Sequence, residues 1–146
     1  MRELKFRGYH EEKGMFPVYG LDEKYVYQDT YDSAEYLQNI FPIKNVHLMQ
    51  YTGLEDKNGI EIYEGDIIKV IGDTEVYYDD SLFEPSENVE FELITEVFYN
   101  ETIASFDLST IEADLNMKHW GFYGEGTESH LEVIGNIHQN PELINY

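Results

Sequence analysis

The sequence predicts a mainly β protein with one or two short helices, and three observations support this fold class. Apolar and polar residues alternate in several short segments, a period of two that is typical of strands with one buried face. Asn58-Gly59 separates two such segments, and this dipeptide predicts a tight hairpin turn. The best helical pattern is a short one, over residues 33–40, and Pro42 follows it closely.

Size, charge and composition limit the classes of protein that this chain can belong to. Its 146 residues and 17.2 kDa suit one domain, or two small subdomains that share a core. With 30 Asp and Glu against 9 Lys and Arg, the net charge of −21 disfavours direct binding to nucleic acid or to an anionic membrane. The chain has 0 Cys and opens without the apolar run of a signal peptide, so we expect a cytoplasmic protein.

Residues 1–64 are predicted to form an N-terminal subdomain of hairpins with one helix. Strands are expected over residues 3–9, 15–19 and 24–28, and Pro17 assigns the second of these to a sheet edge because proline cannot donate a hydrogen bond to a neighbouring strand. Asp32 or Ser33 can cap the helix over residues 33–40. Strands are also expected over residues 46–51 and 60–63, which flank Asn58-Gly59. Both turn residues tolerate the positive φ of a type I′ turn.

Residues 65–146 are predicted to form a second, barrel-like subdomain. Residues 67–71 are almost continuously apolar, which favours a central strand covered on both faces. Alternating patterns at residues 89–93 and 102–108 predict two strands paired as a hairpin. Residues 131–137 would form the closing strand.

Three segments together resemble the signature blocks of the YopX family, proteins encoded mainly by bacteriophages and prophages of Gram-positive bacteria. They are MRELKFR at residues 1–7, MQYTGLEDKNGIEIYEGDIIK at 49–69 and LEVIGNIHQNPEL at 131–143. The first block continues as Gly8-Tyr9-His10, where the family usually has an Ala-Trp-Asp type of sequence, and residues 72–128 carry no family motif. The resemblance implies a mostly β fold with an SH3-like C-terminal barrel, and a protein able to self-associate. It implies no reaction, cofactor or catalytic residue.

The motifs of catalysis and metal binding do not occur in this sequence. The five histidines are scattered without a His-Glu-x-x-His pattern, and no serine lies in a Gly-x-Ser-x-Gly context. His119 and His130 flank an aromatic, glycine-rich segment and could approach each other, but a shared metal site is the less favoured interpretation. We therefore predict no catalytic, cofactor-binding or metal-binding residue, and a protein that is not an enzyme.

The excess negative charge gathers in one stretch of the chain. Residues 70–117 contain no Lys or Arg but 13 Asp and Glu, and residues 79–88 are expected to form a mobile loop. The acidic residues proposed to bind a partner are Asp73, Glu75, Asp79, Asp80, Glu84, Glu87, Glu90 and Glu92. Held on a sheet, these carboxylates could attract a basic patch of a host or phage protein, or imitate the phosphates of DNA. The simpler interpretation is that they keep the protein soluble.

Two other functions stay open at the level of sequence. The chain has 13 Tyr, and amphipathic rings of this kind are enriched at interfaces, which suits a structural protein that assembles as a homo-oligomer. A small hydrolase or a ligand-binding barrel is the second alternative. It would require a pocket on which several carboxylates converge.

Overall fold

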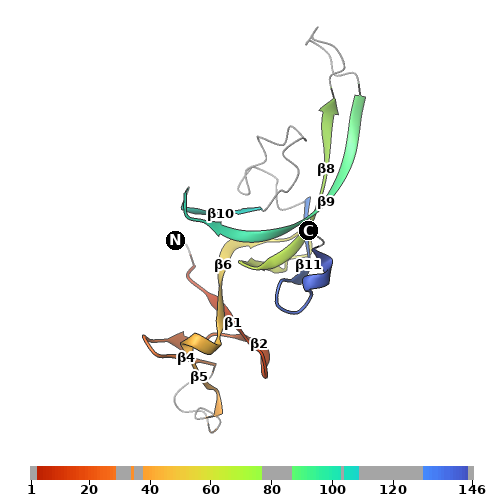
Figure 1. The fold of residues 1–146 in the computed structure, drawn as a ribbon. Coiled ribbons are helices and arrows are strands. Elements are labelled where there is room, and N and C mark those ends of the chain that lie inside the picture. The colour runs from red at the N-terminus through yellow and green to blue at the C-terminus, as the bar shows by residue number, and fades with distance from the viewer. Residues whose placement is uncertain are drawn as a thin grey trace.

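The computed structural model describes residues 3–28, 34, 38–76, 87–102, 104–108 and 130–144, and for residues 72–76, 87–89 and 91 it describes the backbone. This part of the chain is built of three antiparallel sheets, and its helical elements are single 3-10 turns such as η2 (Ile43–Asn45) and η4 (Pro141–Leu143). The predicted fold class is confirmed. The sheets curl into a half-barrel (Figure 1). The family resemblance implied an SH3-like barrel in the C-terminal part of the chain.

The first sheet has the order β2-β1-β6-β7 and is formed by the N-terminal hairpin and the central hairpin. Its strands are β1 (Phe6–His10), β2 (Gly14–Pro17), β6 (His47–Glu55) and β7 (Glu61–Tyr63). β2 is an edge strand that ends at Pro17, as the proline predicted. β6 is longer than expected and pairs with both β1 and β7.

The second sheet has the order β10-β9-β8-β11. Its strands are β8 (Asp66–Val76), β9 (Glu87–Asn100), β10 (Ser105–Leu108) and β11 (Leu131–Asn136). β8 is central, as predicted, because its first residues are mostly buried and it packs between β9 and the closing strand β11. In Figure 1, β8 and β9 continue together beyond the rest of this sheet as a two-stranded ribbon.

The predicted hairpin between residues 89–93 and 102–108 has a different register. β10 does pair with β9, but its partners are residues 97–100, next to the turn, whereas residues 87–96 of β9 pair with β8. The segment at residues 89–93 is therefore the first part of a longer strand, and only the second part of that strand pairs with β10. Residues 79–86 of the expected loop lie outside the described residues, and Glu87 and Asn88 are the first residues of β9.

The third sheet, β3-β4-β5, corrects the C-terminal end of the predicted helix. Its strands are β3 (Gly20–Leu21), β4 (Tyr25–Tyr27) and β5 (Ile40–Pro42). Residues 29–33 and 35–37 lie outside the described residues, but Ile40, the expected last residue of the helix, opens β5 and pairs with Tyr27. This pairing allows Phe41 to pack beside Val26 in a buried cluster, and at Ile40 that burial outweighs a weak local helical pattern.

The turn at Asn58-Gly59 is a hairpin turn, but not of type I′. Gly59 has a φ of +78°, whereas among the described non-glycine residues only Ala104 has a positive φ. The Gly59 N–H donates to the carbonyl of Asp56 at 3.0 Å, and the Asp56 N–H donates to the carbonyl of Ile60 at 2.8 Å. This is a longer turn in which one glycine alone takes the left-handed conformation. The hairpin itself was predicted correctly.

The largest core cluster joins the central hairpin to the second sheet. It consists of buried apolar residues from β7, β8, β9, β10 and β11, namely Ile62, Ile68, Val70, Val97, Phe106 and Leu131. Ile62 lies on the N-terminal side of the boundary expected between residues 64 and 65, and the other members lie on its C-terminal side. That boundary stays a prediction, and the packing shows that the two sides share a core.

Candidate functional site

The acidic residues proposed from the sequence are carried, as far as the structure describes them, by the ribbon of β8 and β9. Asp73 and Glu75 lie in β8, and Glu87, Glu90 and Glu92 lie in β9. The strand register places Asp73 opposite Glu90. The other three, Asp79, Asp80 and Glu84, lie outside the described residues.

The described part of this ribbon presents a mixed face. Lys69 pairs with Ile94 and Ile71 pairs with Glu92, so alternation along each strand places these four residues on the same face. Ile71 and Ile94 are each 42% exposed, and the side chain of Glu92 is 57% exposed. Lys69 Nζ lies 3.5 Å from Glu92 Oε1. We call this set of Lys69, Ile71, Glu90, Glu92 and Ile94 the ribbon face.

A cluster of three rings lies on the first sheet, where sequence reasoning had seen only scattered histidines. Strand pairing places Tyr9 of β1 opposite His47 of β6. His138, in the turn that follows β11, stacks on both rings, with centroid distances of 5.0 Å to Tyr9 and 4.6 Å to His47. This turn is held near β8 because the N–H of Ile137 donates to the carbonyl of Gly65 at 2.9 Å.

The stacked imidazoles line a pocket of about 380 Å³ between β6, β9 and the turn after β11. Apolar side chains such as Val46, Val97 and Ile137 form part of its wall, and Glu64 and Glu96 are also in the lining. The interplanar angle of 26° between His47 and His138 keeps their nitrogen lone pairs in nearly parallel planes, which does not suit a shared metal ion. Among the described residues, no group of three His, Asp or Glu side chains is arranged to hold a metal.

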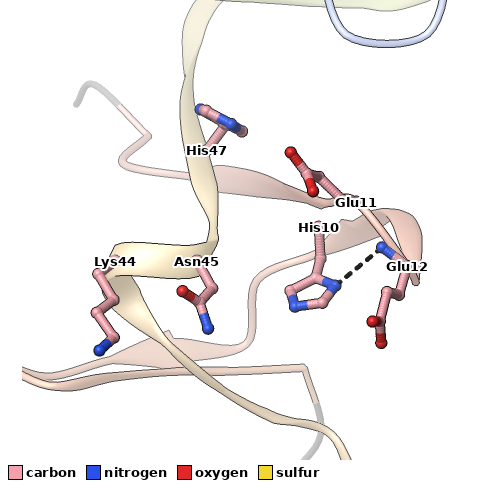
Figure 2. Close-up of a pocket in the computed structure, with 6 residues that line it drawn as sticks. All are labelled: His10, Glu11, Glu12, Lys44, Asn45 and His47. Carbon is pink, nitrogen blue, oxygen red and sulfur yellow. Dashed lines mark hydrogen bonds between the residues drawn. The ribbon is translucent and has the colours of Figure 1, made fainter.

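A second pocket, of about 330 Å³, lies between the turn after β1 and the start of β6. Figure 2 shows its lining residues, which are His10, Glu11, Glu12, Lys44, Asn45 and His47. Nδ1 of His10 accepts a hydrogen bond from the backbone N–H of Glu12 at 3.2 Å, so a neutral His10 carries its proton on Nε2. Acidic and basic side chains both line this pocket, so its charge favours neither an anionic nor a cationic ligand.

A buried ion pair joins β1 to the first residue of β8. Arg7 donates to the carboxylate of Asp66, whose side chain is 1% exposed, and the Arg7 guanidinium lies 4.6 Å from the ring centroid of Tyr63. Asp66 Oδ2 also accepts the backbone N–H of Tyr63 at 2.8 Å. Burial raises the pKa of Asp66, while Arg7 and the Tyr63 N–H act to lower it. Both partners lie in the segments that resemble the YopX blocks, and their role is to hold these segments together.

Sequence reasoning named residues of β8 and β9, whose role as a site stays a prediction, but missed the ring cluster. The alternative that paired His119 with His130 is not tested, because His119 lies outside the described residues. His47 and His138 lie ninety-one positions apart in the chain, and only the pairing of β1 with β6 and of β8 with β11 brings them together. No local signal in the sequence could have revealed this contact.

The fold defines the chain as a mainly β protein with a curled half-barrel, and comparison with known proteins assigns its family. The sequence profile described as YopX protein matches residues 5–145. The chain therefore belongs to the YopX family, as its sequence blocks indicated. It is also similar to protein EF1440 from Enterococcus faecalis, known from a crystal structure, with 26% sequence identity, a TM-score of 0.59 and coverage of 99% of this chain and 100% of that one. No functionally curated protein matches the chain.

Proposed function

We propose that this protein acts by binding another protein, and that the ribbon face is its contact surface for a basic partner. The observation that carries the proposal is the arrangement of exposed carboxylates beside exposed isoleucines on the ribbon of β8 and β9. Glu90 and Glu92 are exposed, and Ile71 and Ile94 are each 42% exposed. In the described part of the chain, no helix is long and apolar enough to cross a membrane.

The two kinds of side chain would serve different steps of binding. A net charge of −21 attracts a basic surface over a distance and speeds up encounter. Apolar side chains buried at the centre of an interface then slow dissociation. This mixed surface favours a partner that has Lys or Arg around an apolar depression. The other form of this hypothesis is a pure imitation of DNA phosphates, which would not explain why Ile71 and Ile94 are exposed among the acidic residues. The resemblance to the YopX family, which implied a phage or prophage protein, favours a bacterial cytoplasm as the place of this encounter.

The test is affinity capture from a bacterial lysate with the wild type and a Glu90→Lys/Glu92→Lys variant, washed across a salt series. We expect a basic protein that the wild type retains at low salt, the ribbon variant loses and high salt elutes. A matched control, Glu11→Lys/Glu12→Lys, makes the same change of charge at two exposed residues in the turn after β1. Equal capture by wild type and ribbon variant, or loss in the control alone, would contradict the proposal.

Self-association is the second candidate function, and a separate set of residues supports it. Tyr19, Leu21 and Tyr25 are 66%, 44% and 41% exposed on or beside the small third sheet. Exposed tyrosines of this kind suit an interface between copies of the chain. Size-exclusion chromatography with light scattering tests self-association. A wild-type oligomer that dissociates in the variant Tyr19→Ser/Tyr25→Ser supports it, and a wild-type monomer at micromolar concentration contradicts it.

A further inference from the structure

The turn of residues 137–140 meets the first sheet through the ring of His138. This ring packs on Tyr9 with an interplanar angle of 12° and on His47 with one of 26°, while the Tyr9 and His47 centroids are 6.4 Å apart. His138 therefore contacts both strands of the β1–β6 pair at once. Stacked contacts of this type are favourable when the rings are neutral.

The turn that carries His138 is organised by its own hydrogen bonds. Asn136 Oδ1 accepts the N–H groups of His138 at 3.1 Å and Gln139 at 2.9 Å, and Asn136 Nδ2 donates to Gln139 Oε1 at 2.8 Å. The N–H of Asn140 also donates to the carbonyl of Asn136 at 2.9 Å. These bonds lie within the turn, so a change at the rings need not disrupt it.

The surroundings of His138 oppose its protonation overall. Burial is the main cause that lowers its pKa, followed by the neighbouring His47 of β6 and Arg7 of β1. The carboxylates of Glu64, after β7, and Glu96, in β9, line the same pocket and favour the protonated form. The outcome is a pKa of His138 below its ordinary value of about 6.5. The stabilisation from this group is therefore complete above that pH and decreases as the pH falls.

We propose that His47 and His138 form a proton-operated latch between the turn of residues 137–140 and the β1–β6 pair. While both rings are neutral, they stack and hold the turn on the sheet. When His138 takes up a proton, its charge lies in a half-buried stack, 4.6 Å from the His47 ring centroid and with Arg7 nearby, and the contact loosens. This device is independent of the binding function proposed above, because it involves no residue of the ribbon face.

The test is an NMR titration of the full chain from pH 7.5 to 5.0. We expect the NOE contacts between the rings of Tyr9 and His138 to disappear as the His138 imidazole takes up a proton, together with shifts of the His138 and Gln139 amide signals. In His138→Phe, a ring that cannot be charged keeps the stack, so the Gln139 amide should hold its position throughout. His47→Phe removes one charge and should move the titration of His138 to higher pH. As a control, His130→Gln changes an exposed histidine outside the cluster and should leave the wild-type response intact.

Two results would overturn the latch. One is the persistence of the Tyr9–His138 contacts after the ring signals of His138 show that it has taken up a proton. The other is an equal shift of the Gln139 amide in wild type and in His138→Phe, which would assign the response to another group. If His138→Phe fails to fold, the wild-type ring contacts and the His47→Phe titration still decide the question.

Discussion

At the scale of single residues, Asp56 shows how one buried carboxylate can join distant segments. Its Oδ1 accepts the N–H groups of Asn58 at 2.8 Å and Ile60 at 3.0 Å, and its Oδ2 accepts the N–H of Val133 in β11 at 2.9 Å. The same residue thus shapes the hairpin turn and attaches it to the closing strand. Backbone N–H groups that lose such an acceptor in a buried position are costly.

We predict that Asp56→Asn lowers the free energy of unfolding by about 1–3 kcal/mol, because an amide cannot accept all three hydrogen bonds. Burial acts to raise the pKa of Asp56, but the three N–H donors outweigh it and the pKa lies below its ordinary value. The stabilisation is therefore present above a pH of about 3.9 and is lost as the pH falls through the folded-state pKa. Urea unfolding at several pH values measures both effects. The exposed neighbour provides the control, since Glu55→Gln should change stability by less than about 0.5 kcal/mol.

The buried pair of Arg7 and Asp66 leads to a second prediction at this scale. Asp66→Asn should destabilise the protein by about 3–5 kcal/mol, because it leaves the Arg7 guanidinium without its partner. The double variant Arg7→Leu/Asp66→Asn should recover part of this loss, since the introduced amide oxygen can still accept the Tyr63 N–H and no charge stays buried. A double-mutant cycle by urea unfolding measures the coupling. Strictly additive effects would show that the pair does not act as a unit.

At the scale of elements, close packing of strands explains one glycine. A Cβ atom at Gly8 of β1 would lie 2.8 Å from both Phe16 Cζ and Val46 Cγ1. Gly8→Ala should therefore lower the free energy of unfolding by about 1–3 kcal/mol through overpacking. Gly20→Ala is the matched control, because a Cβ there meets no atom within 4 Å, and its effect should stay within about 0.5 kcal/mol. Thermal unfolding of both variants checks the prediction, and equal melting temperatures would contradict it.

The pairing of β8 with β9 places two acidic residues, Asp73 and Glu90, opposite each other in the register. Like charges at such positions destabilise a sheet, so Glu90→Gln should raise the free energy of unfolding by about 0.2–1 kcal/mol at low salt. The gain should shrink at high salt, because screening weakens the repulsion. Urea unfolding at two salt concentrations measures it. Under the proposed function, this stabilised variant should also bind its partner more weakly, and a loss of stability would contradict the repulsion.

Elements were predictable where local chemistry determines them. Pro17 indicated an edge strand, the apolar run at residues 67–71 indicated a central one, and Asn58-Gly59 indicated a hairpin. The prediction was wrong where distant contacts decide, as at Ile40, which pairs with Tyr27. The same applies to β9, whose two halves pair with different neighbours. Even at the hairpin, the turn type depends on the contacts of Asp56, one of which comes from β11.

At the scale of the whole molecule, charge was the part of the candidate site that composition could predict. The absence of Lys and Arg from residues 70–117 pointed to an acidic surface, and the register now places five of its proposed residues on the ribbon. Ile71 and Ile94 lie exposed beside these acids, but the sequence placed Ile71 in a covered central strand and Ile94 just beyond the strand expected over residues 89–93. Exposure depends on which face of a strand the other sheets cover, and alternation alone does not determine it.

The net charge of −21 on 146 residues also predicts how the protein responds to salt. Repulsion among like charges is stronger in the compact state than in the extended chain, so it lowers the stability of the fold. We expect the Tm to rise when NaCl increases from about 10 to about 150 mM, because the Debye length falls from about 30 Å to about 8 Å. Most of the rise should be complete in this range, whereas a general effect of salt on apolar hydration would continue to grow in proportion to concentration. Calorimetry from about 10 mM to about 1 M NaCl separates the two. A Tm that is constant or falling in the lower part of this range would show that ion pairs such as Lys57 with Glu132 outweigh the repulsion.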